Sequence, residues 1–352
     1  MTCIYCTADK IGIQTGGGIV THHEAEAMRS FSNGDIMVWG RDQMNQANGK
    51  DPWLWDDYTR GLVSYPYARC KLAHFYAGTF SRTVSYLKGQ NSKVTYTAAA
   101  HDVTLSRQEH QKLGMYYDYP HMTIPSLWER YLQGYLDADV LICPSPHSAN
   151  VMKGFGAKNR IEIIPHGVDI PEPKPSVKQS QFTVGYLGAV GPDKGLIYLL
   201  EAWKKLNYHD ATLLLAGGAS TSPFVKDLIR GFGGGNIECL GWVDDLSKFY
   251  ESLSLYVQPS VTEGFGIEVL EACAHGVRTI ACKGAGASYL LPPPWNMAES
   301  KNVDQLVYLI DFARRNCDYD PEQFRDIARN CTWDKIHKKY QDVWRSLLDE
   351  KS

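Results

Sequence analysis

In the second half of the chain, short runs of β-branched and other apolar residues alternate with helical patterns at a regular spacing. The runs 182–190, 211–218 and 253–260 are typical of buried strands, and 195–206 has the period of an amphipathic helix. Strands that are apolar throughout and separated by helices predict a parallel sheet covered on both faces. We therefore expect a doubly wound α/β domain that binds ligands beyond the carboxyl ends of its strands.

The first half follows the same alternation less regularly. Strands are predicted at 2–8, 34–40, 93–102 and 138–145, and two stretches rich in aromatic residues, 51–67 and 113–136, lie between them. These rings either fill the core beside the sheet or form an acceptor-binding surface. A proline-rich polar segment at 165–181 interrupts the pattern and predicts a linker. The chain is thus expected to form two α/β domains, 1–168 and 169–332, followed by a closing helix at 333–352.

Composition narrows the class of protein. The chain has 352 residues, 44% of them hydrophobic, which excludes a disordered protein, and its net charge of −3 does not favour a nucleic acid as partner. Nine cysteines are an odd number for a disulfide framework, and no signal peptide or membrane-spanning run is evident, so we expect a cytoplasmic protein. Cys3 and Cys6 have CxxC spacing without a second pair, so no metal site is predicted. Peripheral membrane contact through Trp53 and Trp55 has no support, because that segment lacks a basic face.

The strongest signal for chemistry lies in SVTEGFGIEVLEACAHG, residues 260–276. Gly264 and Gly266 fall where a predicted strand ends and a helix begins, so backbone amides there form an anion site suited to phosphate. Glu263 precedes these amides, and Glu271 lies on a helix with mostly apolar neighbours, where a carboxylate is costly unless something satisfies it. Glu268, the third acidic residue of this segment, is assigned to a solvated or structural face.

This segment resembles the donor-site motif of the retaining GT-B glycosyltransferases of family 4, also called group 1. Three further segments are similar to that family in the same order along the chain: 147–169, 188–202 and 332–348. The resemblance implies the GT-B fold, which has two facing Rossmann-like domains with parallel sheets and an interdomain cleft. It also implies that the closing helix, 333–352, packs back on the N-terminal domain.

The resemblance assigns roles around the donor. Glu263 is expected to contact the donor sugar near the reacting centre, and Glu271 to bind the ribose hydroxyls. The phosphates are expected to be held by the backbone amides of Gly264, Phe265, Gly266 and Ile267. Contacts to the base are expected from the backbone near Val243.

In this family an arginine and a lysine after the first strand of the second domain neutralise the leaving diphosphate without a bound metal. The lysine is present as Lys194, but Ala189 stands at the arginine position. Lys283 and Arg278 are candidates to replace that arginine. No metal and no cofactor are predicted, because positively charged side chains neutralise the diphosphate in this family, as Mg²⁺ does in other enzymes.

Two segments of the first half complete the expected site. The glycines of TGGGIVTHHEAEAM resemble the family's loop that approaches the donor phosphates, which assigns the amides of Gly17 and Gly18 to donor binding. In TYTAAAHDVTLS, His101 matches the family histidine that reaches the donor sugar, and Asp102 is expected to orient the imidazole or its loop. His101, Lys194 and Glu263 are therefore the predicted catalytic residues.

We therefore expect a hexosyltransferase that moves a sugar from a UDP- or GDP-sugar to a hydroxyl acceptor with retention at the anomeric carbon. The acceptor, a glycan, lipid or small molecule, cannot be read from the sequence. Two alternatives stay open: a sugar-nucleotide epimerase or sugar-phosphate synthase on the same fold, and a non-catalytic nucleotide-sugar-binding protein. Ala189 motivates the second alternative.

Overall fold

The protein is described by a computed structural model that covers residues 2–7, 11, 16–40, 59–60, 70–76, 80–114, 125–172, 181–218, 220–221, 223–232, 236–316 and 318–350. The chain divides into two compact units. Unit 1 comprises Met1–Ala100, Asp118–His166 and Trp333–Ser352, and unit 2 comprises His101–Tyr117 and Gly167–Thr332. The segment that begins at His101 therefore belongs to unit 2, whereas the sequence placed it in the N-terminal domain.

Unit 1 is built on a parallel sheet of six strands in the order β2-β1-β3-β4-β5-β6. The strands are β1 (Cys3–Thr7), β2 (Ile36–Trp39), β3 (Leu72–Tyr76), β4 (Lys93–Thr97), β5 (Val140–Cys143) and β6 (Arg160–Ile163). The helices of this unit are α1 (Gly16–Phe31), α4 (Ser81–Gly89), α7 (Pro125–Asp137), α8 (Pro146–Gly154) and α15 (Trp333–Asp349).

The sequence predicted four of the six strands of unit 1, and one of these four ends well before its predicted end. The sequence did not predict β3, which has His74 at its centre, or β6, an edge strand in which no residue is fully buried. The strand predicted at 93–102 ends at Thr97, and the polypeptide continues through His101 into unit 2. Of the aromatic stretch 51–67 only residues 59 and 60 are described, and part of 113–136 also lies outside the described residues.

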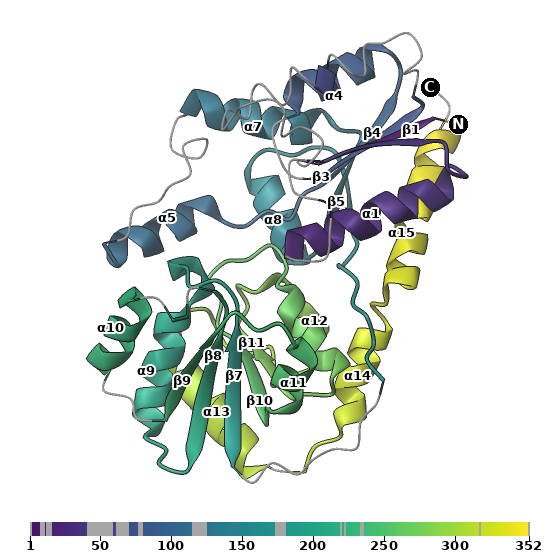
Figure 1. Ribbon diagram of the computed structural model, residues 1–352. Coiled ribbons are helices and arrows are strands. Elements are labelled where there is room, and N and C mark those ends of the chain that lie inside the picture. Colours follow the sequence, from purple (N-terminus) through teal and green to yellow (C-terminus); the bar gives the residue numbers. More distant parts are fainter. Residues whose placement is uncertain are drawn as a thin grey trace. The chain divides into compact units, whose positions relative to one another are not determined.

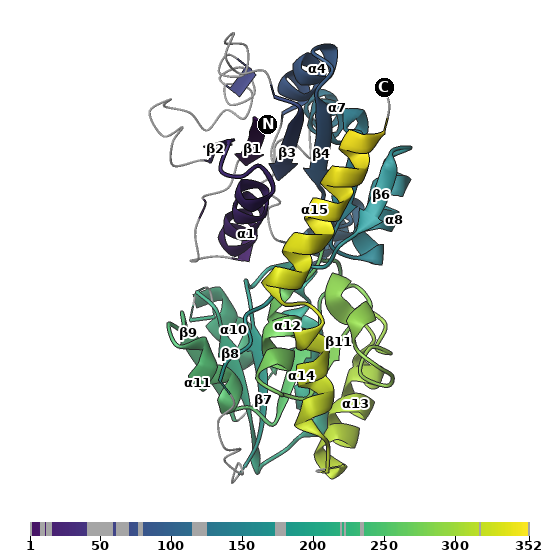
Figure 2. The same ribbon diagram turned by 90° about the vertical axis from the view of Figure 1, so that its right-hand side faces the viewer.

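The C-terminal helix α15 is attached to unit 1 by a buried polar network beneath α1. Glu24 of α1 accepts hydrogen bonds from Tyr5 (3.0 Å), Thr97 (2.8 Å) and Tyr340 of α15 (2.7 Å). Trp344 is fully buried and its indole N–H donates to Thr95. Because a buried carboxylate is costly without partners, these bonds fix α15 against α1 and the sheet. Figure 2 shows α15 running alongside the strands of this sheet.

Unit 2 is built on a parallel sheet of five strands in the order β11-β10-β7-β8-β9. The strands are β7 (Phe182–Leu187), β8 (Ala211–Ala216), β9 (Ile237–Gly241), β10 (Leu255–Gln258) and β11 (Thr279–Ala281). Helices cover both faces of the sheet (Figure 1). The described helices of this unit are α5 (Val103–Lys112), α9 (Leu196–Leu206), α10 (Pro223–Phe232), α11 (Leu246–Glu251), α12 (Ile267–Ala274), α13 (Val303–Arg315) and α14 (Pro321–Arg329), with short 3-10 helices η1 (Pro192–Lys194) and η2 (Gly286–Leu290).

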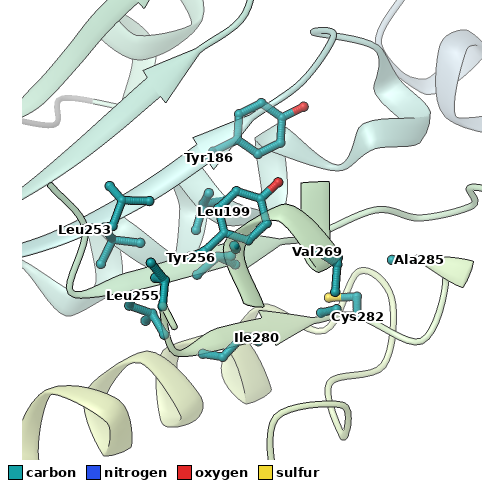
Figure 3. Packing of buried hydrophobic residues seen from close by; sticks show 14 of the residues in the cluster. Tyr186, Leu199, Leu253, Leu255, Tyr256, Val269, Ile280, Cys282 and Ala285 are labelled. Atoms are coloured by element: carbon teal, nitrogen blue, oxygen red, sulfur yellow. The ribbon is translucent and has the colours of Figure 1, made fainter. Parts of the chain in front are cut away.

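The core of unit 2 is continuous under the central strands. Figure 3 shows Tyr186 of β7 beside Tyr256 of β10, with Leu253 and Leu255 packed next to them. All four side chains are at most 5% exposed. Burial of this scale holds the two central strands rigidly, so the loops that leave their carboxyl ends start from fixed positions.

The order of strands in unit 2 reverses direction between β7 and β10. At such a switch point the connections from the two central strands run to opposite faces of the sheet and leave a crevice at their carboxyl ends, where open α/β sheets bind ligands. In unit 1 the corresponding reversal lies between β1 and β3. Among the described helices, none is long and apolar enough to span a membrane.

Candidate active site

The loops after β7 and β10 are bonded to each other at the switch point of unit 2. The backbone N–H of Val261 donates to the carbonyl oxygen of Asp193 over 2.7 Å. Gly195 has φ +71°, and a Cβ at this position would lie 2.1 Å from the carbonyl oxygen of Pro259. Only glycine allows this approach, so the two loops form one preorganised surface.

Lys194 and Glu263 form a buried ion pair on this surface. The ammonium group of Lys194 donates to Oε1 of Glu263, and the two side chains are 22% and 10% exposed. Burial alone would raise the pKa of Glu263, but Lys194 holds it below its usual value. Burial likewise opposes the charge on Lys194, and Glu263 outweighs it so that the lysine pKa lies above its ordinary range. Both groups therefore carry their charges at neutral pH.

The second oxygen of Glu263 is also satisfied. Its Oε2 accepts hydrogen bonds from the hydroxyl of Ser260 (2.7 Å) and the side-chain amide of Gln258 (2.9 Å), both buried. Three donors thus fix the carboxylate in one orientation. The sequence analysis missed Gln258 and Ser260, although polar residues at the end of a buried strand are a signal that points to them.

The helix start that was predicted as a phosphate site is present. Gly266, with φ +87°, is the N-cap of α12, and no side chain caps the helix there. Gly264 and Phe265 lie in the preceding loop and Ile267 is the first residue of the helix. The amides at the start of α12 therefore follow Glu263 within four residues of sequence, at the positive end of the helix dipole.

Glu268, which the sequence assigned to a solvated or structural face, lies in the first turn of α12 and is partly buried. Burial, followed by the nearby charge of Glu263, raises the pKa of Glu268 to about 8. A carboxyl group that stays largely protonated at neutral pH adds little negative charge beside the helix start. An acidic residue at this position is therefore compatible with an anionic ligand below pH 8.

Glu271 lies one turn further along α12 and is held by α11. The hydroxyl of Tyr250 donates to Oε2 of Glu271 over 2.8 Å, which leaves the other oxygen to accept from a ligand. Burial raises the pKa of Glu271, and the hydrogen bond from Tyr250 opposes that shift. Val243, in the loop between β9 and α11, is partly buried against the core, and Trp242 beside it is 63% exposed.

His101 lies in unit 2 with these groups. The backbone N–H of Asp102 donates to the hydroxyl of Thr262 over 2.8 Å, and Thr262 immediately precedes Glu263. The Asp102 carboxylate accepts from the N–H of Leu105 and so caps α5, which means that it orients the loop and not the imidazole. Burial lowers the pKa of His101, and Lys194 contributes to that shift while Asp193 and Glu263 oppose it. The imidazole is therefore neutral at pH 7.

Gly17 and Gly18 lie in unit 1, in the first turn of α1. This helix is the next described element after β1, one of the two strands at the switch point of that sheet. The sequence analysis expected a glycine loop before the helix, whereas the helix itself begins at Gly16. The residues just before it, 12–15, lie outside the described part of the chain.

The two candidates for the missing arginine are engaged elsewhere. Arg278 is buried and its guanidinium donates to the carbonyl oxygens of Ala313 and Asn316, so it attaches α13 to the sheet. Lys283 forms an ion pair with Glu299. Within the described residues, no group of three or more His, Cys, Asp or Glu side chains is arranged to hold a metal ion.

Residues 181–309, which include every loop described above except the His101 segment, match the family Glycosyl transferases group 1. This part of unit 2 is therefore similar to the group 1 glycosyltransferases. An uncharacterized glycosyltransferase of Methanocaldococcus jannaschii is 28% identical over 185 residues, which are 49% of this chain and 47% of that protein. The chain spans about half the length of the curated relatives that it matches.

Solved structures show the same fold over the whole chain. A glycosyltransferase from Rickettsia africae has a TM-score of 0.72 at 18% identity and covers 99% of both chains. The Anabaena protein HepE, in complex with UDP, has a TM-score of 0.70 at 14% identity and covers 98% of this chain and 100% of its own. The chain therefore has a GT-B fold with two parallel sheets, as the sequence predicted. The interdomain cleft stays a prediction.

Proposed function

We propose that the protein is a retaining glycosyltransferase that moves a hexosyl group from a nucleotide-diphosphate sugar to a hydroxyl acceptor. The observation that carries this proposal is the Lys194–Glu263 pair beside the N-terminus of α12, at the switch point of a sheet that is similar to the group 1 glycosyltransferases. A lysine, a carboxylate and backbone amides at one edge suit a diphosphate that is bonded to a sugar. The Anabaena neighbour solved with UDP favours a UDP-sugar as the first donor to test.

In the proposed complex the diphosphate lies against the amides that run from Gly264 to Ile267, with Lys194 at its side. Glu271, whose orientation Tyr250 holds, accepts hydrogen bonds from the ribose hydroxyls. The backbone near Val243 contacts the base. The proposed complex requires no metal or cofactor.

In the reaction the bond from the anomeric carbon to the leaving phosphate oxygen breaks, and a bond to the acceptor oxygen forms on the same face of the sugar. The leaving phosphate takes the proton of the acceptor hydroxyl, and Lys194 and the helix amides stabilise the charge that develops on it. Glu263 is bound by three donors, which disfavours it as a covalent nucleophile and favours a contact to the sugar. Neutral His101 is suited to a hydrogen bond with a sugar hydroxyl.

The proposal is tested by incubating the protein with UDP-glucose, UDP-N-acetylglucosamine and GDP-mannose together with a panel of glycan acceptors. We expect one donor to be consumed, a product with the donor's anomeric configuration by proton NMR, and loss of turnover in Glu263→Gln. The matched control is Glu238→Gln, an exposed glutamate on β9. Donor sugar that is interconverted without an acceptor would identify an epimerase instead.

Ala189 favours a second candidate, a protein that binds a nucleotide sugar without turning it over. Its carbonyl oxygen accepts from the hydroxyl of Tyr186, and its side chain supplies no positive charge for a leaving diphosphate. This candidate predicts donor binding without consumption for every acceptor. Ala189→Arg would then be the variant to examine for a gain of turnover.

A further inference from the structure

The helix α5 contains a buried carboxylate that the proposed reaction does not use. Glu109 is 4% exposed, and a carboxylate so buried is costly unless other groups satisfy it. The hydroxyl of Tyr198, on α9, donates to its Oε2 over 2.6 Å, and the ammonium of Lys301 lies 3.3 Å from its Oε1. Both partners come from the C-terminal half of the chain, so Glu109 bonds α5 to the body of unit 2.

The partners of Glu109 are themselves fixed. The Tyr198 hydroxyl also accepts from Lys112, whose ammonium lies 4.9 Å from the centre of the tyrosine ring. Lys301 has φ +69°, a left-handed conformation that lysine rarely adopts. Its neighbour Ser300 donates to the carbonyl oxygen of Ser260, the residue whose hydroxyl binds Glu263. The loop that presents Lys301 to Glu109 is therefore bonded to the loop that holds Glu263.

His101 lies just before the N-terminal end of α5, near the loop that holds Glu263. Asp102 caps the helix at Leu105 and donates its own N–H to Thr262. The helix packs against η1, which contains Lys194. The hydrogen bond from Asp102 to Thr262 and the packing of α5 on η1 thus hold the backbone beside His101 at the active-site edge.

We propose that Glu109 is a positioning residue that, through Tyr198 and Lys301, anchors α5 to the body of unit 2 and so holds His101 beside Lys194 and Glu263. The inference rests on the proposed function for the role of His101 in transfer, but the anchoring itself does not. His101 then acts as part of unit 2, although it lies in the N-terminal half of the sequence.

Three variants separate anchoring from simple packing. Glu109→Ala removes both bonds, Tyr198→Phe removes the hydroxyl and keeps the ring, and Glu109→Gln keeps an acceptor for Tyr198 while it removes the charge that faces Lys301. Gln108→Ala is the matched control, because Gln108 is the exposed neighbour on the same helix. Thermal unfolding shows that each variant is folded before it is compared.

The first readout needs no donor and no acceptor. NMR of the full chain with ¹⁵N-labelled histidine, with the His101 signal assigned through His101→Gln, gives the imidazole pKa. In the wild type it lies below its ordinary value, chiefly because the ring is buried. In Glu109→Ala we expect the pKa to rise towards the ordinary value and amide hydrogen exchange to speed up along 103–112. Tyr198→Phe is expected to show a smaller change, and Glu109→Gln the smallest.

The second readout uses whichever donor the wild type consumes in the test of the proposed function. We expect kcat to fall about 10- to 100-fold in Glu109→Ala, with the Kd for the nucleoside diphosphate changed less than about twofold, because the amides of α12 and Lys194 remain in place. In the His101→Ala background, Glu109→Ala is expected to have little further effect on kcat.

An unchanged His101 pKa in folded Glu109→Ala and Tyr198→Phe would overturn the proposal, even if α5 exchanged faster. Equal and additive losses of kcat in the His101→Ala background would also overturn it. If the wild type bound no nucleotide, the proposed function would fail, while the NMR measurement would still decide whether Glu109 positions His101.

Discussion

Replacing Glu268 by glutamine tests the electrostatics of the helix start directly. Glu268 occupies the first turn of α12, where the donor diphosphate is proposed to bind. Burial and the charge of Glu263 raise the pKa of its carboxyl group to about 8. Below that pH the group is mostly neutral, and above it the group places a second negative charge beside the phosphates.

The size of the effect follows from this pKa. If the diphosphate binds only when Glu268 is protonated, the Kd is multiplied by one plus ten raised to the difference between the pH and the pKa. With the pKa near 8, the factor is about 1.1 at pH 7, about 2 at pH 8 and about 11 at pH 9. In Glu268→Gln this factor is absent at every pH.

Three other titratable groups of the site keep their protonation state over this range. Lys194 has a raised pKa and stays charged, Glu263 has a lowered pKa and stays ionised, and His101 has a lowered pKa and stays neutral. Tyr186 and Tyr256 remain protonated because burial raises the pKa of each hydroxyl. Glu268 is therefore expected to dominate the pH dependence that the protein itself contributes.

Isothermal calorimetry with UDP at pH 7, 8 and 9 measures the effect on the wild type, on Glu268→Gln and on the control Glu238→Gln. Titration of the ligand affects all three proteins alike, so the ratio of wild-type Kd to variant Kd isolates Glu268. We expect the ratio of the wild-type Kd to the Glu268→Gln Kd to increase about tenfold from pH 7 to pH 9. The ratio of the wild-type Kd to the Glu238→Gln Kd should stay constant. A wild-type to Glu268→Gln ratio that stays constant across this range would refute the reasoning.

Three further changes test the architecture that supports the site. Lys194→Met leaves the buried Glu263 without its counter-charge, so urea unfolding should show a loss of about 3 kcal/mol and calorimetry a loss of UDP binding. Unchanged binding would contradict the assignment. Gly195→Ala should lower the melting temperature of the protein by several degrees, because the new methyl group meets a backbone oxygen, whereas Gly89→Ala meets nothing within 4 Å and should be neutral. Trp344→Ala should lower the free energy of unfolding by about 3–5 kcal/mol, because the indole is fully buried, and a loss below 1 kcal/mol would show that α15 does not need it.

The arrangement of unit 2 was accessible from the sequence because its strands are apolar throughout and its loops carry glycines where the backbone demands them. The spacing of Glu263 and Glu271 along one strand, loop and helix places both at one edge of the sheet. Lys194 follows the neighbouring strand, so parallel pairing brings it to that edge. These are consequences of local sequence, which a periodic pattern can show.

Contacts between distant segments were not accessible in the same way. The strand β3 was missed because His74 interrupts its apolar run, and only the fold places Glu24 beside it. The partner of Glu271, Tyr250, lies on another helix. Glu268 was assigned to a solvated or structural face because helical spacing alone does not show that Glu263 lies beside it.

The assignment of the His101 segment to unit 2 is the clearest such case. A histidine at the end of a predicted strand indicates a site residue, but nothing near it in the sequence shows which unit holds it. That depends on Asp102 meeting Thr262, which lies 160 residues further along the chain. Long-range contacts of this kind set the geometry of a site that short motifs only outline.

Binding of nucleoside diphosphates is the measurement that tests the central claim most directly. Calorimetric titration of the wild type with UDP, GDP and ADP should show selective binding of one of them, weakened at least about tenfold in Glu271→Ala, since the ribose hydroxyls lose their acceptor. Glu238→Ala, an exposed glutamate on β9, should bind as the wild type does. A folded wild-type protein that binds none of the three nucleotides would contradict the account.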